Sequence, residues 1–71
     1  MKRTVIATQS QLQNIGIDRV LTDMEVEVIH RYPDGWFQIK VPPKQEIIDI
    51  LGEDTASEYY EEYDIPGKYL K

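Results

Sequence analysis

The feature that most constrains this chain is a turn sequence between two segments of alternating polarity. Residues 24–31 (MEVEVIHR) place apolar side chains at every second position over most of their length, which is the period of a half-buried strand. Residues 33–35 (Pro-Asp-Gly) follow, and they supply the fixed φ, the turn-forming aspartate and the glycine that a tight turn uses. Residues 36–41 (WFQIKV) form the return strand, and the prolines at 42–43 end it because proline cannot donate to a ladder. The pattern predicts a β-hairpin with a three-residue loop and a bulge at Gly35.

Both faces of this hairpin are expected to be partly apolar. If Tyr32 pairs with Trp36, Ile29 lies opposite Ile39. The other apolar residues then divide between two faces, Phe37 and Val41 with Ile39 on one, and Met24, Val26 and Val28 with Trp36 on the other. A ribbon of this kind must be covered on both sides or strongly curled. An SH3-like, half-open barrel would do this, and so would a flat sheet with helices on one side.

Shorter signals surround the hairpin. Residues 3–8 are rich in β-branched side chains and predict a strand. A capping box of Ser10 with Gln13 predicts a helix near 10–15. An apolar stripe predicts a second helix over 44–51, ended by a glycine. A second capping box, Thr55 with Glu58, predicts a third helix over 55–63, with its tyrosines on one side and glutamates on the other.

These elements predict an α+β fold with a small antiparallel sheet of about three strands and short helices, the last one acidic. We expect one small domain over residues 1–71, because 71 residues provide a single core. Within it, residues 1–52 form a nearly neutral sheet core and residues 53–71 an acidic, tyrosine-rich helix and tail. The net charge of −5 divides into −1 for the first segment and −4 for the second. A chain of this size buries only about 60% of its surface, so a partner subunit, including a second copy in a homodimer, would complete the core.

The side-chain inventory indicates no catalytic, cofactor or metal site, and we expect no enzymatic activity. The chain has no cysteine, which excludes disulfides, thiol catalysis and cysteine zinc sites. His30 is the one side chain that ordinarily titrates near neutral pH, but no triad pattern surrounds it. Both serines, Ser10 and Ser57, lie in the predicted capping boxes. Glu25 and Glu27 are interpreted as one solvated strand face.

The acidic, tyrosine-rich segment is the clearest functional signal. Tyrosine gives a large contact area at a small entropic cost, and carboxylates complement a basic patch. We therefore predict a non-enzymatic, cytoplasmic protein that binds a basic surface of another protein, as an inhibitor or adaptor of the kind that phages and mobile elements encode. If that surface ordinarily binds phosphates, the segment would mimic nucleic acid. The predicted partner-binding residues are Glu58, Tyr59, Glu61, Glu62, Tyr63 and Asp64, with Trp36 as an apolar anchor. The simpler interpretation is a solvated helix face.

A DNA-binding dimer is the alternative function. It would be a regulator or an antitoxin-like protein with an acidic partner-binding tail, and Lys2, Arg3 and Arg19 would contact phosphates. The net charge of −5 argues against direct nucleic-acid binding by the whole molecule. No apolar run approaches the ~20 residues of a membrane span, so no membrane partner is expected.

Overall fold

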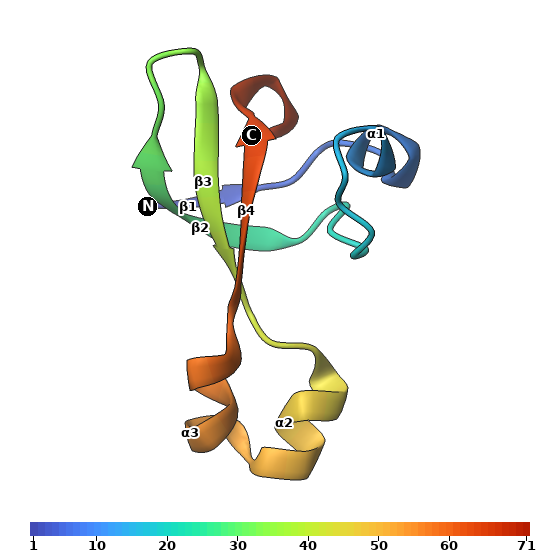
Figure 1. Ribbon diagram of the computed structural model, residues 1–71, viewed down its shortest axis with the longest axis vertical. Coiled ribbons are helices and arrows are strands. Elements are labelled where there is room, and N and C mark those ends of the chain that lie inside the picture. Colours follow the sequence, from blue (N-terminus) through green and yellow to red (C-terminus); the bar gives the residue numbers. More distant parts are fainter.

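Four strands form one antiparallel sheet in the order β1-β2-β3-β4 in the computed structural model, which describes residues 1–71 (Figure 1). The strands are β1 (Lys2–Thr4), β2 (Glu25–Arg31), β3 (Trp36–Val41) and β4 (Glu61–Pro66). The helices are α1 (Gln9–Asn14), α2 (Gln45–Leu51) and α3 (Glu53–Ala56), with 3₁₀ turns η1 (Ser57–Tyr59) and η2 (Gly67–Tyr69). The predicted α+β class is confirmed, with four strands in the sheet.

The C-terminal residues close the sheet against β1. Thr4 and Lys71 exchange two backbone hydrogen bonds of 3.1 and 2.8 Å, and Val5 forms a bridge with Leu70. The chain reaches this position through the single turn η2, directly after β4. Because β1 pairs with β2 on one side and with the C-terminal residues on the other, the sheet curls around its core. This arrangement matches the half-open barrel among the predicted alternatives.

The central hairpin has the predicted turn. The Tyr32 N–H donates to the Trp36 carbonyl at 2.8 Å, and Gly35 has a φ of +90°. A non-glycine residue would be strained in this left-handed conformation. The Gly35 carbonyl also accepts a bond of 2.9 Å from the Gly67 N–H. The hairpin loop and the turn after β4 are therefore joined through their backbones.

A β-bulge at Ile29 changes which residues face the core. Val28 pairs with Ile39 and His30 with Gln38, so Ile29 has no partner in the register. The prediction that Ile29 lies opposite Ile39 is therefore wrong. Since one extra residue reverses the alternation of a strand, Val26 and Val28 lie on the same face as Ile39, and Val26 is buried.

Ten buried residues form one hydrophobic core inside the barrel. They come from the strands, α1, the loops between β1 and β2, and the C-terminus: Val5, Ala7, Leu12, Ile17, Leu21, Val26, Ile39, Val41, Ile65 and Leu70. The predicted helix near 10–15 is present as α1, but its capping box consists of Thr8 and Gln11 rather than Ser10 and Gln13. The cap precedes the predicted one by two residues, which lets Leu12 enter the core.

The predicted helix over 55–63 is wrong in its second half. Helical structure ends at Tyr59, Thr55 lies inside α3 rather than at its N-cap, and residues 61–66 form β4. Tyr63 pairs with Ile39 and Glu62 with Lys40. These pairs satisfy the backbone groups of β3 on a side that would otherwise be an open edge, and Ile65 enters the core. Local helical periodicity thus yields to strand pairing.

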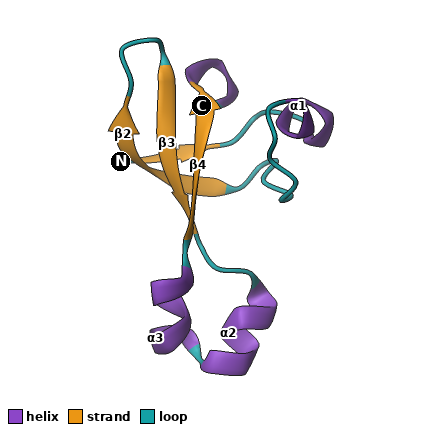
Figure 2. Cartoon of the chain, viewed as in Figure 1, coloured by secondary structure: helices purple, strands orange, loops and turns teal.

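Residues 42–60, between β3 and β4, form a helical lobe that projects away from the barrel (Figures 1 and 2). The molecule is consequently elongated, with extents of 36 × 24 × 18 Å. The predicted helix over 44–51 is confirmed as α2, and Gly52 caps it with a φ of +81°. None of the helices has the length and apolar character required to cross a membrane.

Candidate functional site

The structure separates the predicted partner-binding residues into three places. Glu58 and Tyr59 lie in η1 of the helical lobe. Glu61 and Tyr63 point from β4 toward the barrel, on the side of the buried Ile65. Glu62, Asp64 and Trp36 lie on the outer face of the sheet. They do not form the single acidic surface that the sequence predicted, because β4 is a strand and alternate residues face opposite sides.

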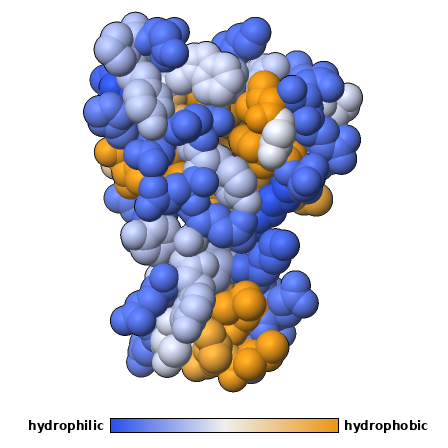
Figure 3. Space-filling view, viewed as in Figure 1, coloured by the Kyte–Doolittle hydropathy of each residue, from blue (hydrophilic) through white to orange (hydrophobic).

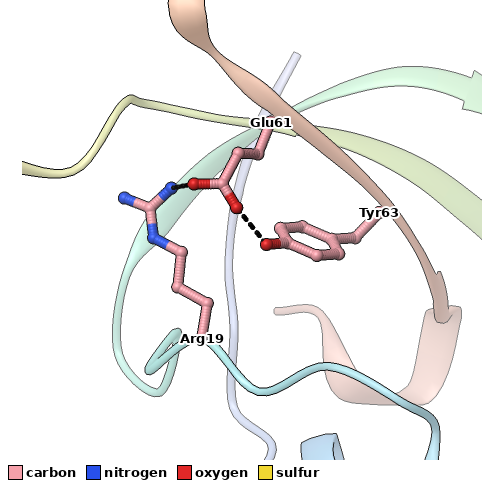
Figure 4. A network of polar contacts seen from close by, with 3 residues as sticks. All are labelled: Arg19, Glu61 and Tyr63. Carbon is pink, nitrogen blue, oxygen red and sulfur yellow. Dashed lines mark hydrogen bonds and ion pairs between the residues drawn. The ribbon is translucent and has the colours of Figure 1, made fainter. Parts of the chain in front are cut away.

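Glu61 belongs to an internal polar network (Figure 4). Its carboxylate accepts a hydrogen bond of 2.9 Å from Arg19 Nη1 through one oxygen and a hydrogen bond from the Tyr63 hydroxyl through the other. The Arg19 side chain is only 10% exposed, and that of Glu61 is 33% exposed. The network holds the loop that precedes β2 against strand β4. Glu61 and Tyr63 therefore have a structural role, and both oxygens of the Glu61 carboxylate already accept a hydrogen bond within the chain.

The same network changes the acidity of Tyr63. Burial of the phenol and its hydrogen bond to the Glu61 carboxylate both favour the protonated form, and Arg19 opposes them. Together they raise the pKa of Tyr63 to about 12. Tyr63 thus remains a neutral hydrogen-bond donor to Glu61 throughout the physiological range.

Two carboxylates on the outer face of the sheet, those of Glu62 and Asp64, and the carboxylate of Asp34 in the hairpin loop each accept a hydrogen bond within the chain. Glu62 accepts a hydrogen bond of 2.8 Å from Gln38 Nε2. Asp64 accepts one of 2.9 Å from the Tyr32 hydroxyl, and this bond raises the pKa of Tyr32 above its ordinary value. The Asp34 carboxylate accepts a hydrogen bond of 2.9 Å from the backbone N–H of Trp36. Each carboxylate keeps acceptor capacity for a cationic group.

Two shallow hollows meet at Trp36. One, of about 340 Å³, is lined by Asp34, Gly35, Trp36, Pro66, Gly67 and Lys68. The other, of about 180 Å³, is lined by Tyr32, Asp34, Trp36 and Asp64. Trp36 is paired with Pro66 in the sheet and is partly exposed. An aromatic ring, a proline and a tyrosine thus line an open groove, which we call the Trp36 groove, with the carboxylates of Asp34 and Asp64 at its edge.

The glycines at the groove let two backbone segments approach closely. A Cβ atom added to Gly67 would lie 2.7 Å from the Gly35 carbonyl oxygen, closer than real contacts allow. Only a residue without a side chain can therefore occupy this position without displacing the hairpin loop. The Gly35–Gly67 contact fixes the floor of the larger hollow, which both residues line.

The three basic residues predicted for DNA contacts are not brought together. Lys2 and Arg3 are adjacent in β1 and point to opposite faces of the sheet. Lys2 lies 3.6 Å from Glu25, while Arg3 donates to the Leu70 carbonyl and lies over the Phe37 ring. Arg19 is held by Glu61. Each of the three cations has a partner within the chain.

The sequence identified Trp36 and Asp64 but missed Asp34 and Pro66 as members of the groove. The Pro-Asp-Gly turn could have indicated Asp34, since the residue lies two positions after Tyr32 and two positions before Trp36. Nothing local indicates Pro66, because its proximity to Trp36 results from pairing between β3 and β4. His30 packs its ring against Tyr32 at 4.8 Å and is exposed.

No group of three or more His, Cys, Asp or Glu residues has the arrangement of a metal site. Comparison of the chain with protein-family models, with curated proteins and with solved structures found no match. The groove around Trp36 and the surface of the helical lobe are accordingly interpreted from their own chemistry.

Proposed function

We propose that this chain is a non-enzymatic protein-binding module, an adaptor or inhibitor, that holds a basic, proline-containing extended segment of a partner protein in the Trp36 groove. The observation that carries the proposal is the position of Trp36 between two hollows with Asp34 and Asp64 at their edge. Tryptophan and tyrosine are the residues that most often anchor protein interfaces. The carboxylates favour a partner with lysine or arginine beside its apolar positions.

An extended segment suits this groove better than a flat protein surface. The two hollows share Trp36 and Asp34 but have different outer walls, Pro66 and Gly67 for one and Tyr32 and Asp64 for the other. A ligand that fills both must place two separate side chains on either side of the indole ring. Proline-rich segments are already extended, so they lose little entropy on docking, and aromatic-lined grooves of SH3 domains hold such segments. The fold of a chain does not by itself assign its function, so the proposal depends on the groove alone.

The fluorescence of Trp36 tests the proposal directly, because it is the only tryptophan in the chain. The titrant is a 12-residue peptide with alternating proline and arginine, and two matched peptides replace its arginines by glutamate or its prolines by alanine. We expect a saturable change in fluorescence with the first peptide and at least tenfold weaker binding of the other two. Asp64→Asn should weaken binding of the first peptide, since it removes a charge but keeps an acceptor for Tyr32.

Two controls separate groove binding from general attraction to an acidic protein. Glu46→Gln removes one carboxylate from the helical lobe, away from the groove, and is expected to leave binding unchanged. Trp36→Ala, measured with a fluorescently labelled peptide, is expected to abolish binding. Equal binding of the glutamate peptide, or an unchanged affinity of Trp36→Ala, would overturn the proposal.

A further inference from the structure

The helical lobe, residues 42–60, has an apolar end with almost no core of its own. Its one buried residue is Ala56, and α2 contains none. Ile50 is 77% exposed, Leu51 39% and Tyr59 57%. Figure 3 shows hydrophobic surface gathered at the end of the lobe, over α2. Single exposed apolar residues are common on protein surfaces, but a contiguous apolar patch marks an interaction site.

The apolar stripe of α2 is wider than its neighbour can cover. At about 100° per residue, the positions of Ile47, Ile48, Ile50 and Leu51 span roughly 160° of the helix circumference. Ile47 and Ile48 are half-buried, whereas Ile50 and Leu51 are exposed. The only helix packed beside α2 is α3, which has four residues. The stripe is therefore half-buried in the first half of α2, at Ile47 and Ile48, and exposed in its last turn, at Ile50 and Leu51.

Charge determines what can cover this surface. The lobe carries five carboxylates, those of Glu46, Asp49, Glu53, Asp54 and Glu58, against one lysine, Lys44, which gives −4 of the total charge of −5. All five acidic residues are exposed. A second copy of the chain would bring a like charge of −4 toward these carboxylates, and nucleic acid would be repelled as well. The complementary partner has an apolar centre and basic flanks.

The secondary structure of the lobe determines the shape of that partner. Its secondary structure consists of α2, α3 and η1 and includes no strand, so it offers no strand edge for pairing. Two short helices that expose a row of aliphatic and aromatic side chains resemble the grooves in which amphipathic helices dock. We propose that the apolar end of the helical lobe binds a basic amphipathic helix of a partner protein.

This surface is independent of the Trp36 groove. Trp36 begins β3, whereas the lobe follows the end of that strand at Val41. The lobe approaches the sheet through Lys40, whose Nζ lies 4.3 Å from the centre of the Tyr60 ring. The inference goes beyond the proposed function, and either surface can fail its test while the other passes.

The test uses the full chain and a synthetic 18-residue peptide that forms an amphipathic helix with leucines on one face and lysines on the other. A peptide with glutamates in place of the lysines is the charge control. Isothermal titration calorimetry is expected to detect saturable binding of the lysine peptide and at least tenfold weaker binding of the glutamate peptide. Both peptides bury the same leucines, so the difference between their affinities measures the contribution of the carboxylates of the lobe.

Variants locate the binding surface. Ile50→Ser with Leu51→Ser removes two exposed side chains from the lobe without touching the core, and it is expected to weaken binding of the lysine peptide at least tenfold. The matched control is Ile29→Ser, which changes an exposed isoleucine on the barrel and should leave the affinity unchanged. Trp36→Ala should also leave it unchanged, which distinguishes this surface from the groove.

Three results would overturn the inference. The first is an unchanged affinity of the Ile50→Ser, Leu51→Ser variant for the lysine peptide. The second is equal binding of the glutamate peptide. The third is a concentration-dependent dimer in sedimentation that disappears in the same variant, because a second copy would then be the occupant of the apolar end.

Discussion

The barrel and the helical lobe of this protein use similar residues to different effect. The barrel, made of residues 1–41 and 61–71, contains all ten residues of the hydrophobic core. The lobe has six large apolar or aromatic side chains that are exposed or only half-buried around the single buried Ala56, among them Ile47, Ile48 and Ile50. A barrel brings side chains from several strands into one interior, whereas two short helices have only each other to pack against. The apolar content of a segment therefore does not determine how much of it is buried.

The barrel and the helical lobe also differ in net charge. The lobe holds −4 of the net charge of −5, and the barrel is nearly neutral at −1. The sequence suggested that the acidity belongs to the C-terminal segment 53–71. The fold instead distributes that segment over both regions, because residues 61–66 are a barrel strand while residues 53–59 belong to the lobe. Most of the net negative charge is thus carried by the lobe, whereas the carboxylates of the barrel are nearly balanced by its basic residues.

The largest expected effect comes from making the same substitution in both regions. Ile39→Ala removes a fully buried side chain from the barrel, and such changes lower the free energy of unfolding by about 2–5 kcal/mol. Ile50→Ala removes a side chain that is 77% exposed, so it should change the free energy of unfolding by less than about 0.5 kcal/mol. Urea unfolding of both variants, followed by Trp36 fluorescence, measures the difference. Equal destabilisation would mean that the two regions share one core.

A smaller effect concerns the network that fastens β4 into the barrel. Tyr63 has a pKa of about 12 in the folded chain against 10.0 for an ordinary tyrosine. Between these two pH values the unfolded chain releases a proton that the folded chain retains, so the free energy of unfolding falls as the pH rises through this window and is unaffected below it. Tyr63→Phe should remove this part of the alkaline loss. At pH 7 it should lower the free energy of unfolding by about 1 kcal/mol, since the Glu61 carboxylate loses a donor.

Urea unfolding at pH 7 and at several values between 10 and 12 measures both effects. Tyr59→Phe, which removes an exposed hydroxyl from the lobe, is the matched control and should leave the stability at pH 7 unchanged. If the wild type and Tyr63→Phe lose stability in parallel above pH 10, the hydroxyl of Tyr63 is not held by Glu61 in solution.

Local sequence patterns predicted the parts of the fold that local interactions determine. The hairpin follows from alternation and from the glycine at position 35, and α2 follows from its apolar stripe and Gly52. The bulge at Ile29 could not be predicted, because it depends on which residues of β2 and β3 find partners. Without the bulge, Val26 would have faced away from the core.

The errors in predicting the candidate site also arise from contacts between residues that are distant in the sequence. Residues 61–66 fit a helical pattern through Tyr60 and Tyr63, yet their inward-facing positions 61, 63 and 65 also have period two, and pairing with β3 decides between the two patterns. Arg19 and Glu61 are 42 residues apart, so no local sequence pattern predicts their ion pair. The Trp36 groove is likewise assembled from two segments distant in sequence, residues 32–36 and 64–68. Trp36 could be proposed from its position after the turn, but its neighbour Pro66 could not.

Native-state hydrogen exchange of the full chain tests the contrast between the two regions most directly. The barrel is expected to protect the amides of the paired residues of β2 and β3 up to the free energy of global unfolding. The amides of α2, such as those of Ile48 and Gly52, whose hydrogen bonds to Lys44 and Ile48 lie within the lobe, should exchange at least a hundredfold faster. Equal protection of α2 and the barrel strands would contradict this account, because the lobe would then be stabilised without a partner.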